Sequence, residues 1–266
     1  MSLRPTNPKK LNLDDLKPGD ILLSAGDSDI DKIILMLDQG DYSHTTQYIG
    51  VENGKHMVVE ATTGGIKYHS TAEDMKVQTL VDVYRYKSLD GHQLGDAGWP
   101  AAPVTSHAQT FAGGAYAYTD LLLVAVVLLA SEMPHDKYLK EVTRLLLANV
   151  QHQIVKWLVD NSGKTPMTCV QVATSAFWEA ATTPEHKYAL QIDINGARHN
   201  PFTSKEAEAY CEIRKTILSS ISHLQNTDGF KAFAGSDMLP LGSCTPRDLQ
   251  TSPTLNFIGC LKDSRK

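Results

Sequence analysis

The chain has 266 residues, of which 42% are hydrophobic and 21% are charged, and its formal net charge is −5. This length is enough to bury a substantial core, as one domain or as one domain with a large insertion. The acidic balance gives no general attraction to nucleic acids or acidic membranes. Small molecules, peptides or glycan-linked peptides are therefore the favoured partners.

The first twenty residues lack the apolar segment of a signal peptide. The longest apolar run covers residues 121–130, about half of what a helix needs to cross a bilayer. We interpret this run as a buried helix and predict no transmembrane segment. The sequence predicts a protein that is cytoplasmic in the producing cell, with export by a signal-peptide-independent secretion system as an open alternative.

The hydrophobic pattern predicts strands over 21–25, 43–51, 56–61, 65–69 and 80–87, with a helix over 27–40 after the first strand. A loop rich in Gly, Pro and Asp follows over 88–103. Helices are expected over 106–161, 168–181 and 204–224, and a short strand near the end of the chain. No repeat or low-complexity linker separates these elements, so we predict a single α+β domain over residues 1–266.

The four cysteines are few and scattered: Cys169, Cys211, Cys244 and Cys260. They form no CxxC pair and no spacing typical of a structural zinc site. We therefore expect no metal and no organic cofactor. One disulfide, for example between Cys244 and Cys260, stays open.

Cys169 has a distinctive position at the start of a predicted helix. Thr168 and Gln171 have the spacing of a capping box, which makes Cys169 the first helical residue. A thiol at this point faces unpaired N–H groups and the positive end of the helix dipole, which favour the thiolate. Cys169 is thus a candidate nucleophile, with a buried structural cysteine as the plainer alternative.

A cysteine nucleophile needs a base and a polar group that orients the base. His44 and Glu60 lie on adjacent predicted strands and could fill these two roles. Either residue alone is explained more simply, His44 as a solvated strand end and Glu60 as the polar side of a half-buried strand. Their occurrence together with Cys169 favours a catalytic site.

These segments, in this order, resemble the circularly permuted NlpC-type cysteine hydrolases, a papain-like family. The matching segments are LKPGDILL, SHTTQYIG, VVEAT, GGAYAY, CVQVATSAFWEA and TPRDLQTSP, within residues 14–87, 106–130, 164–181 and 244–259. The resemblance implies that Cys169 is the nucleophile, His44 the base and Glu60 the residue that orients it. The chain departs from the family where Ser or Thr and then Glu commonly follow the cysteine, because it has Val170 and Gln171 there.

The resemblance also implies a permuted papain-like fold, in which a small antiparallel sheet or barrel packs on the nucleophile helix. The helical insertions, at about 131–161 and 182–240, are longer than the family pattern. The expected activity is that of a cysteine peptidase or amidase that forms a thioester intermediate. Tyr48 and Tyr116 are weaker candidates for substrate binding.

Peptides of peptidoglycan are the substrates that the resemblance favours. Because no signal peptide is evident, the enzyme could be delivered as an antibacterial effector toxin, with a cognate immunity protein as its inhibitor. Two alternatives on the same fold are a lipid-directed thioesterase or acyltransferase, and a catalytically inactive binding module.

The hairpin between the strands of His44 and Glu60 makes one geometric prediction. Side chains alternate along a strand, so the length of the turn decides whether these two residues share a face. A two-residue turn, Asn53-Gly54, places them on opposite faces. A three-residue loop that pairs Val51 with Lys55 places them on one face. We therefore predict the longer loop, with Gly54 at positive φ.

Overall fold

The structure is a computed structural model of the chain. It describes residues 3–28, 31–32, 34–35, 40–62, 64–116, 167–180, 186–192 and 244–265. The predicted insertion at 131–161, most of the predicted insertion at 182–240, the apolar run at 121–130 and Cys211 lie outside the described residues, as do most of the expected helices between 106 and 161.

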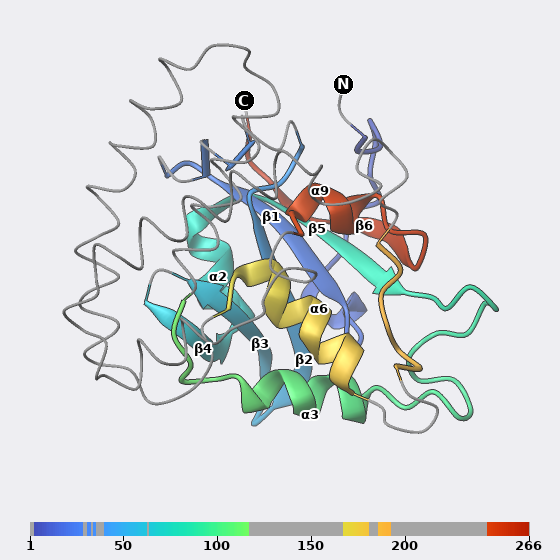
Figure 1. Ribbon diagram of the computed structural model, residues 1–266. Coiled ribbons are helices and arrows are strands. Elements are labelled where there is room, and N and C mark those ends of the chain that lie inside the picture. The colour runs from blue at the N-terminus through green and yellow to red at the C-terminus, as the bar shows by residue number, and fades with distance from the viewer. Residues whose placement is uncertain are drawn as a thin grey trace, which may run out of the picture.

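A six-stranded antiparallel sheet forms the centre of the fold (Figure 1). The strands are β1 (Ile21–Gly26), β2 (His44–Glu52), β3 (Lys55–Thr62), β4 (Gly65–Ser70), β5 (Gln78–Tyr86) and β6 (Leu255–Asp263). Their order across the sheet is β4-β3-β2-β1-β5-β6. All six strands were expected from the sequence, within a few residues at their ends. The α+β class is therefore confirmed.

Short helices accompany the sheet: η1 (Leu13–Asp15), α2 (Thr71–Val77), α3 (Ala102–Thr110), α6 (Cys169–Glu179) and α9 (Pro246–Gln250). Helix α6 packs on β2 and β3, and α3 packs beside α6 and on β2 (Figure 1). Helix α2 packs on β3, β4 and β5. The sequence pattern did not predict α2, and α3 begins inside the loop expected at 88–103.

Two apolar cores lie on the two faces of the sheet, as the alternation of side chains along a strand requires. Ile21 and Leu23 belong to the core that includes Phe177 of α6. Leu22 points the other way, into a core that includes Met75 of α2. The central strand β1 is thus buried on both faces.

The turn between β2 and β3 is shorter than the sequence analysis predicted. Glu52 pairs with Lys55, so Asn53 and Gly54 alone form the turn. Their φ values of 51° and 73° are those of a type I′ turn, which matches the twist of a hairpin. The positive φ of Gly54 is confirmed, whereas the three-residue loop is wrong.

A β-bulge restores the register that the short turn would otherwise prevent. The pairing shifts by one residue between Tyr48 and Gly50, and Gly50 has a φ of 140°. Beyond the bulge Thr46 pairs with Glu60. Because His44 is two residues from Thr46, His44 and Glu60 share one face of the hairpin.

The first described residues of the chain are bound to its last strand. The backbone of Leu11 donates to Cys260, and Cys260 donates to Lys9, at 2.8 and 2.7 Å. The Arg4 guanidinium makes ion pairs with Asp82 of β5 and with Asp263 of β6. Strand β6 is therefore held on one side by β5 and on the other by the segment that precedes η1.

The cysteines in the described part of the chain, Cys169, Cys244 and Cys260, are free thiols. The disulfide that the sequence left open between Cys244 and Cys260 is therefore not formed. Burial and the neighbouring Asp82 carboxyl raise the pKa of Cys260 to about 11, so this thiol stays protonated at neutral pH.

Candidate active site

Cys169 is the first residue of α6, as its sequence context predicted. The hydroxyl of Thr168 accepts a hydrogen bond from the Gln171 backbone at 3.2 Å, and the Gln171 side chain accepts one from the Thr168 backbone at 2.6 Å. This capping box fixes where the helix begins. Cys169 is 4% exposed, and its thiol lies at the end of the helix where the macrodipole is positive.

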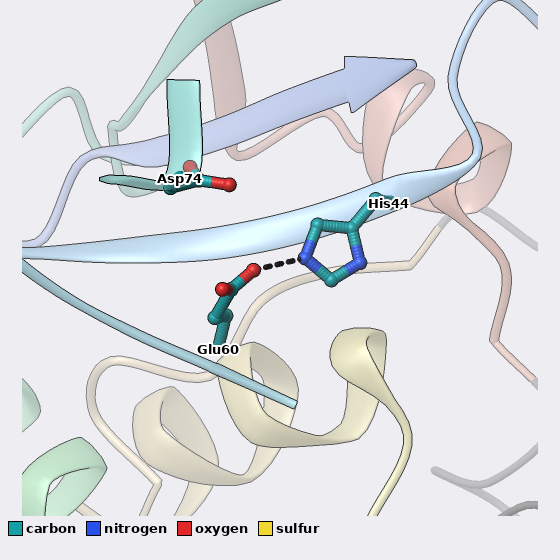
Figure 2. A group of neighbouring side chains, drawn as sticks. All are labelled: His44, Glu60 and Asp74. Carbon is teal, nitrogen blue, oxygen red and sulfur yellow. Dashed lines mark hydrogen bonds and ion pairs between the residues drawn. The ribbon is translucent and has the colours of Figure 1, made fainter. Parts of the chain in front are cut away.

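His44 is the first residue of β2, at the end of the strand, and its side chain is 13% exposed. From this position the ring reaches both the thiol of Cys169 and the carboxylate of Glu60. The Nε2 atom lies 2.5 Å from Oε2 of Glu60 (Figure 2), and the Cys169 thiol is close enough to the ring to raise the pKa of His44. The structure thus brings together the three residues that the sequence analysis singled out.

The charge state of His44 follows from these contacts. Burial disfavours the imidazolium, but the interactions with the Cys169 thiol and with the Glu60 carboxylate outweigh it. Together they raise the pKa of His44 well above its ordinary value. These two contacts therefore favour the positively charged form of the His44 ring.

Glu60 is a buried carboxylate with partners on both oxygens. Besides its contact with His44, Oε1 lies 2.7 Å from Nε2 of His69 on β4. Burial alone would raise the pKa of Glu60, but the hydrogen bonds from the two imidazoles hold it well below its usual range. Glu60 is therefore ionised and can stabilise a positive charge on His44.

The sequence analysis missed two further residues of this cluster, His69 and Asp74. Asp74 of α2 is 2% exposed, and its carboxyl group lies beside the His44–Glu60 pair (Figure 2). His69 pairs with Val58, two residues from Glu60 on the same face of β3. The predicted strand over 65–69 indicated which of its residues share a face with His69. Only the β3–β4 register shows that Glu60 lies on this face.

One group of side chains in the described ranges has the composition of a metal site. The ligand atoms of His44, Glu60 and Asp74 all lie within 4.8 Å of one another. An ion bound by both His44 and Glu60 at ordinary distances would hold their ligand atoms about 3 Å or more apart. Their separation of 2.5 Å is that of a hydrogen bond, so this arrangement does not fit an ion.

The two tyrosines that were candidates for substrate binding have different surroundings. Tyr48 is 1% exposed, and its hydroxyl lies 2.8 Å from Nδ1 of His56, so it is part of the core on the α2 side. Tyr116 forms a parallel bridge with Met167, two residues before Cys169. Tyr116 thus lies beside the chain that leads into α6.

None of the helices in the described residues combines the length and the apolar character that crossing a membrane requires.

Comparisons with known proteins add little to this geometry. No protein-family model matches the chain, and no curated protein sequence matches it. Among solved structures, the metalloprotein yiiX from Escherichia coli O157:H7 is similar over 92% of this chain and 98% of that chain, with 14% sequence identity and a TM-score of 0.48. A similarity of this extent leaves the fold family of the chain open.

Proposed function

We propose that the chain is a cysteine hydrolase that cleaves an amide bond through a thioester intermediate. The observation that carries the proposal is the chain of contacts from Cys169 through His44 to Glu60. A thiol at a helix start, an imidazole against it and a buried carboxylate behind the imidazole are the three parts that a cysteine nucleophile needs. The permuted papain-like fold belongs to the same proposal.

In the proposed reaction His44 takes the proton of Cys169, and the thiolate attacks the carbonyl carbon of the amide. The C–N bond then breaks, and the His44 imidazolium gives its proton to the leaving amine. A water molecule, deprotonated by His44, attacks the thioester, which releases the acid and restores the thiol. Glu60 keeps the imidazole oriented and stabilises its positive charge throughout.

The first turn of α6 supplies stabilisation for the oxyanion. The backbone N–H of Cys169 has no acceptor within the helix because it belongs to the first turn. In the proposed reaction this N–H and the positive end of the helix stabilise the negative charge that develops on the carbonyl oxygen. The loss of one oxyanion donor typically costs about 100-fold or more in rate, so this contribution is substantial.

The proposed substrate class is the peptide of peptidoglycan, and the support for it is the order of motifs that the chain shares with the permuted NlpC-type hydrolases. Delivery as an antibacterial effector with a cognate immunity protein is part of the same proposal. The lipid-directed alternative depends on an apolar groove near residues 121–129, which lie outside the described residues.

Incubation with purified peptidoglycan fragments, followed by mass analysis of the products, tests the proposal. We expect the wild-type chain to release two products whose summed mass exceeds that of the substrate by one water. Cys169→Ala and His44→Ala should release none. The matched control is Cys260→Ala, which removes a buried thiol far along the sheet from His44 and should retain activity. Products from Cys169→Ala at the wild-type rate would overturn the cysteine mechanism.

Alkylation by iodoacetamide provides a test that needs no substrate. At pH 7 Cys169 should react faster than Cys260, because the Cys260 thiol is protonated and the Cys169 thiol lies against the His44 imidazolium. Peptide mapping by mass spectrometry measures both rates in one sample. Equal, slow labelling of the two thiols would instead favour the catalytically inactive binding module.

A further inference from the structure

Glu60 connects two imidazoles, not one. Its Oε2 is bound by His44 of β2 and its Oε1 by His69 of β4, at 2.5 and 2.7 Å. A carboxylate held by a single hydrogen bond can still rotate about its last torsion, whereas one held at both oxygens cannot. His69 thus fixes the plane of the carboxylate that orients His44.

His69 is the more solvated end of this chain of contacts. Its side chain is 18% exposed, and its Nδ1 lies 3.4 Å from a carboxylate oxygen of Glu73. The hydrogen bond to Glu60 raises the pKa of His69 against the opposing effect of burial, and Asp74 and Glu73 add to the increase. The ring therefore carries more positive charge near neutral pH than an ordinary histidine.

Asp74 is the least satisfied group of the cluster. Its Oδ1 accepts a long hydrogen bond of 3.5 Å from Gln78, and its Oδ2 has no hydrogen-bond partner in the part of the chain that the structure describes. Burial first, and the Glu60 charge second, raise the pKa of Asp74 to about 6. A buried carboxyl group with an unsatisfied oxygen destabilises the fold. Its position beside His44 and Glu60 therefore indicates that Asp74 has a function at this site.

We propose that His69 and Asp74 set the protonation of His44 in opposite directions, His69 as a positioning residue that acts through Glu60 and Asp74 through its charge beside the His44 ring. This inference rests on the proposed function, because it concerns the regulation of the same site. His69 contributes a hydrogen bond that orients Glu60 and a positive charge that disfavours the His44 imidazolium. Asp74 contributes a negative charge that favours it.

The direction of each effect follows from the groups around His44. Cys169 approaches from α6, Glu60 from β3 and Asp74 from α2, while His69 of β4 acts from behind Glu60. Because His44 loses its proton well above pH 6.5, Asp74 is ionised over that range and supports the imidazolium. A charge at 4–6 Å typically moves a pKa by about one unit or more.

The test of the charges is an NMR titration of the His44 ring in the full chain. Asp74→Asn should lower the titration midpoint of His44 by about one pH unit, and His69→Gln should raise it. The control His107→Gln removes the more exposed imidazole that contacts Glu179 at 2.9 Å, and it should leave the midpoint unchanged. Midpoints equal to the wild-type value in both variants would overturn the inference. If Asp74→Asn does not fold, His69→Gln carries the test alone.

The test of positioning is the rate of Cys169 alkylation by iodoacetamide at pH 7. His69→Ala should reduce the rate about tenfold, the equivalent of one hydrogen bond to a charged group. His69→Gln keeps a donor at a similar reach and should restore most of the rate. Wild-type reactivity in His69→Ala would refute the positioning role.

The two experiments also separate this inference from the proposed function. An inert Cys169 in the wild-type chain would count against the hydrolase, while the His44 titration would still report on His69 and Asp74. A reactive Cys169 with unmoved His44 midpoints would count against the further inference alone.

Discussion

Gly50 offers a direct test of how the hairpin aligns the candidate site. Its φ of 140° is accessible to glycine but strained for any L-residue with a side chain. A Cβ at this position would lie 3.6 Å from Cγ of Pro18, an ordinary contact, so Gly50→Ala meets no steric block. The cost of the substitution is therefore backbone strain, about 1–3 kcal/mol.

For a chain of this size, each kcal/mol lowers the Tm by roughly 2–4 °C. We therefore expect Gly50→Ala to lower the Tm by about 2–12 °C, measured by circular dichroism together with a urea titration. The strain can be relieved if the bulge is lost. The pairing that begins with Glu52 and Lys55 at the turn would then continue without a shift and place Gln47 opposite Glu60. Glu60 would then share a face with Gln47 and no longer with His44, so the alkylation of Cys169 should slow.

Gly54→Ala is the matched control, because Gly54 also has a positive φ, 73°, with no atom within 4 Å of an added Cβ. It should cost a similar free energy of unfolding, about 1–2 kcal/mol, without moving the bulge. The reasoning fails if Gly50→Ala is as stable as the wild type. It also fails if the two variants, at equal stability, alkylate Cys169 at the same rate.

Three further predictions concern stability and its pH dependence. Thr168→Ala removes one half of the capping box of α6, so it should lower the free energy of unfolding in urea by about 1 kcal/mol and slow the alkylation of Cys169. The control Thr245→Ala removes the same kind of cap from α9, so it should lower the free energy of unfolding by a similar amount and leave the alkylation rate unchanged. Asp74→Asn should gain stability relative to the wild type as the pH rises from 5 to 8. The Asp74 pKa, raised from 3.8 to about 6, stabilises the fold only at low pH, and this contribution is lost as the pH passes 6. Two pKa units correspond to at most about 3 kcal/mol, and an equal difference in unfolding free energy between the two proteins at pH 5 and pH 8 would contradict the prediction. Gly65→Ala should lower the Tm by more than Gly54→Ala, because an added Cβ would lie 2.8 Å from the carbonyl oxygen of Gly114 as well as at a φ of 99°; equal Tm values would show that the backbone there can move aside.

Much of the sheet could be predicted because each strand has its own local pattern. The runs that became β1 to β5 are apolar or alternate with period two, and Gly or Asn marks most of their ends. The start of α6 was equally clear, since Thr168 and Gln171 form a signal within four residues. Short-range patterns of this kind were sufficient to place Cys169, His44 and Glu60 on their elements.

The register of the hairpin was predicted for the wrong reason. Two geometries place His44 and Glu60 on the same face: a three-residue loop, or a two-residue turn combined with a bulge in β2. The requirement of a shared face could therefore not distinguish them. The local signal was Gly50, an isolated glycine inside a predicted strand, which often marks a bulge. Helix α2 and its Asp74 were missed because seven residues between two strands show too little periodicity to be recognised.

Strands β5 and β6 are paired, and the segment from Tyr86 to Leu255 that connects them is the longest connection between paired strands in the described sheet. Closing a loop of this length costs about 4–5 kcal/mol in chain entropy, which only the completed pairing can offset. During synthesis at 5–20 residues per second, β5 would remain an open edge for roughly 9–35 s before Asp263 is made. An unpaired strand edge is a template for association with other chains, so the nascent protein passes through a period in which binding by a chaperone would protect it.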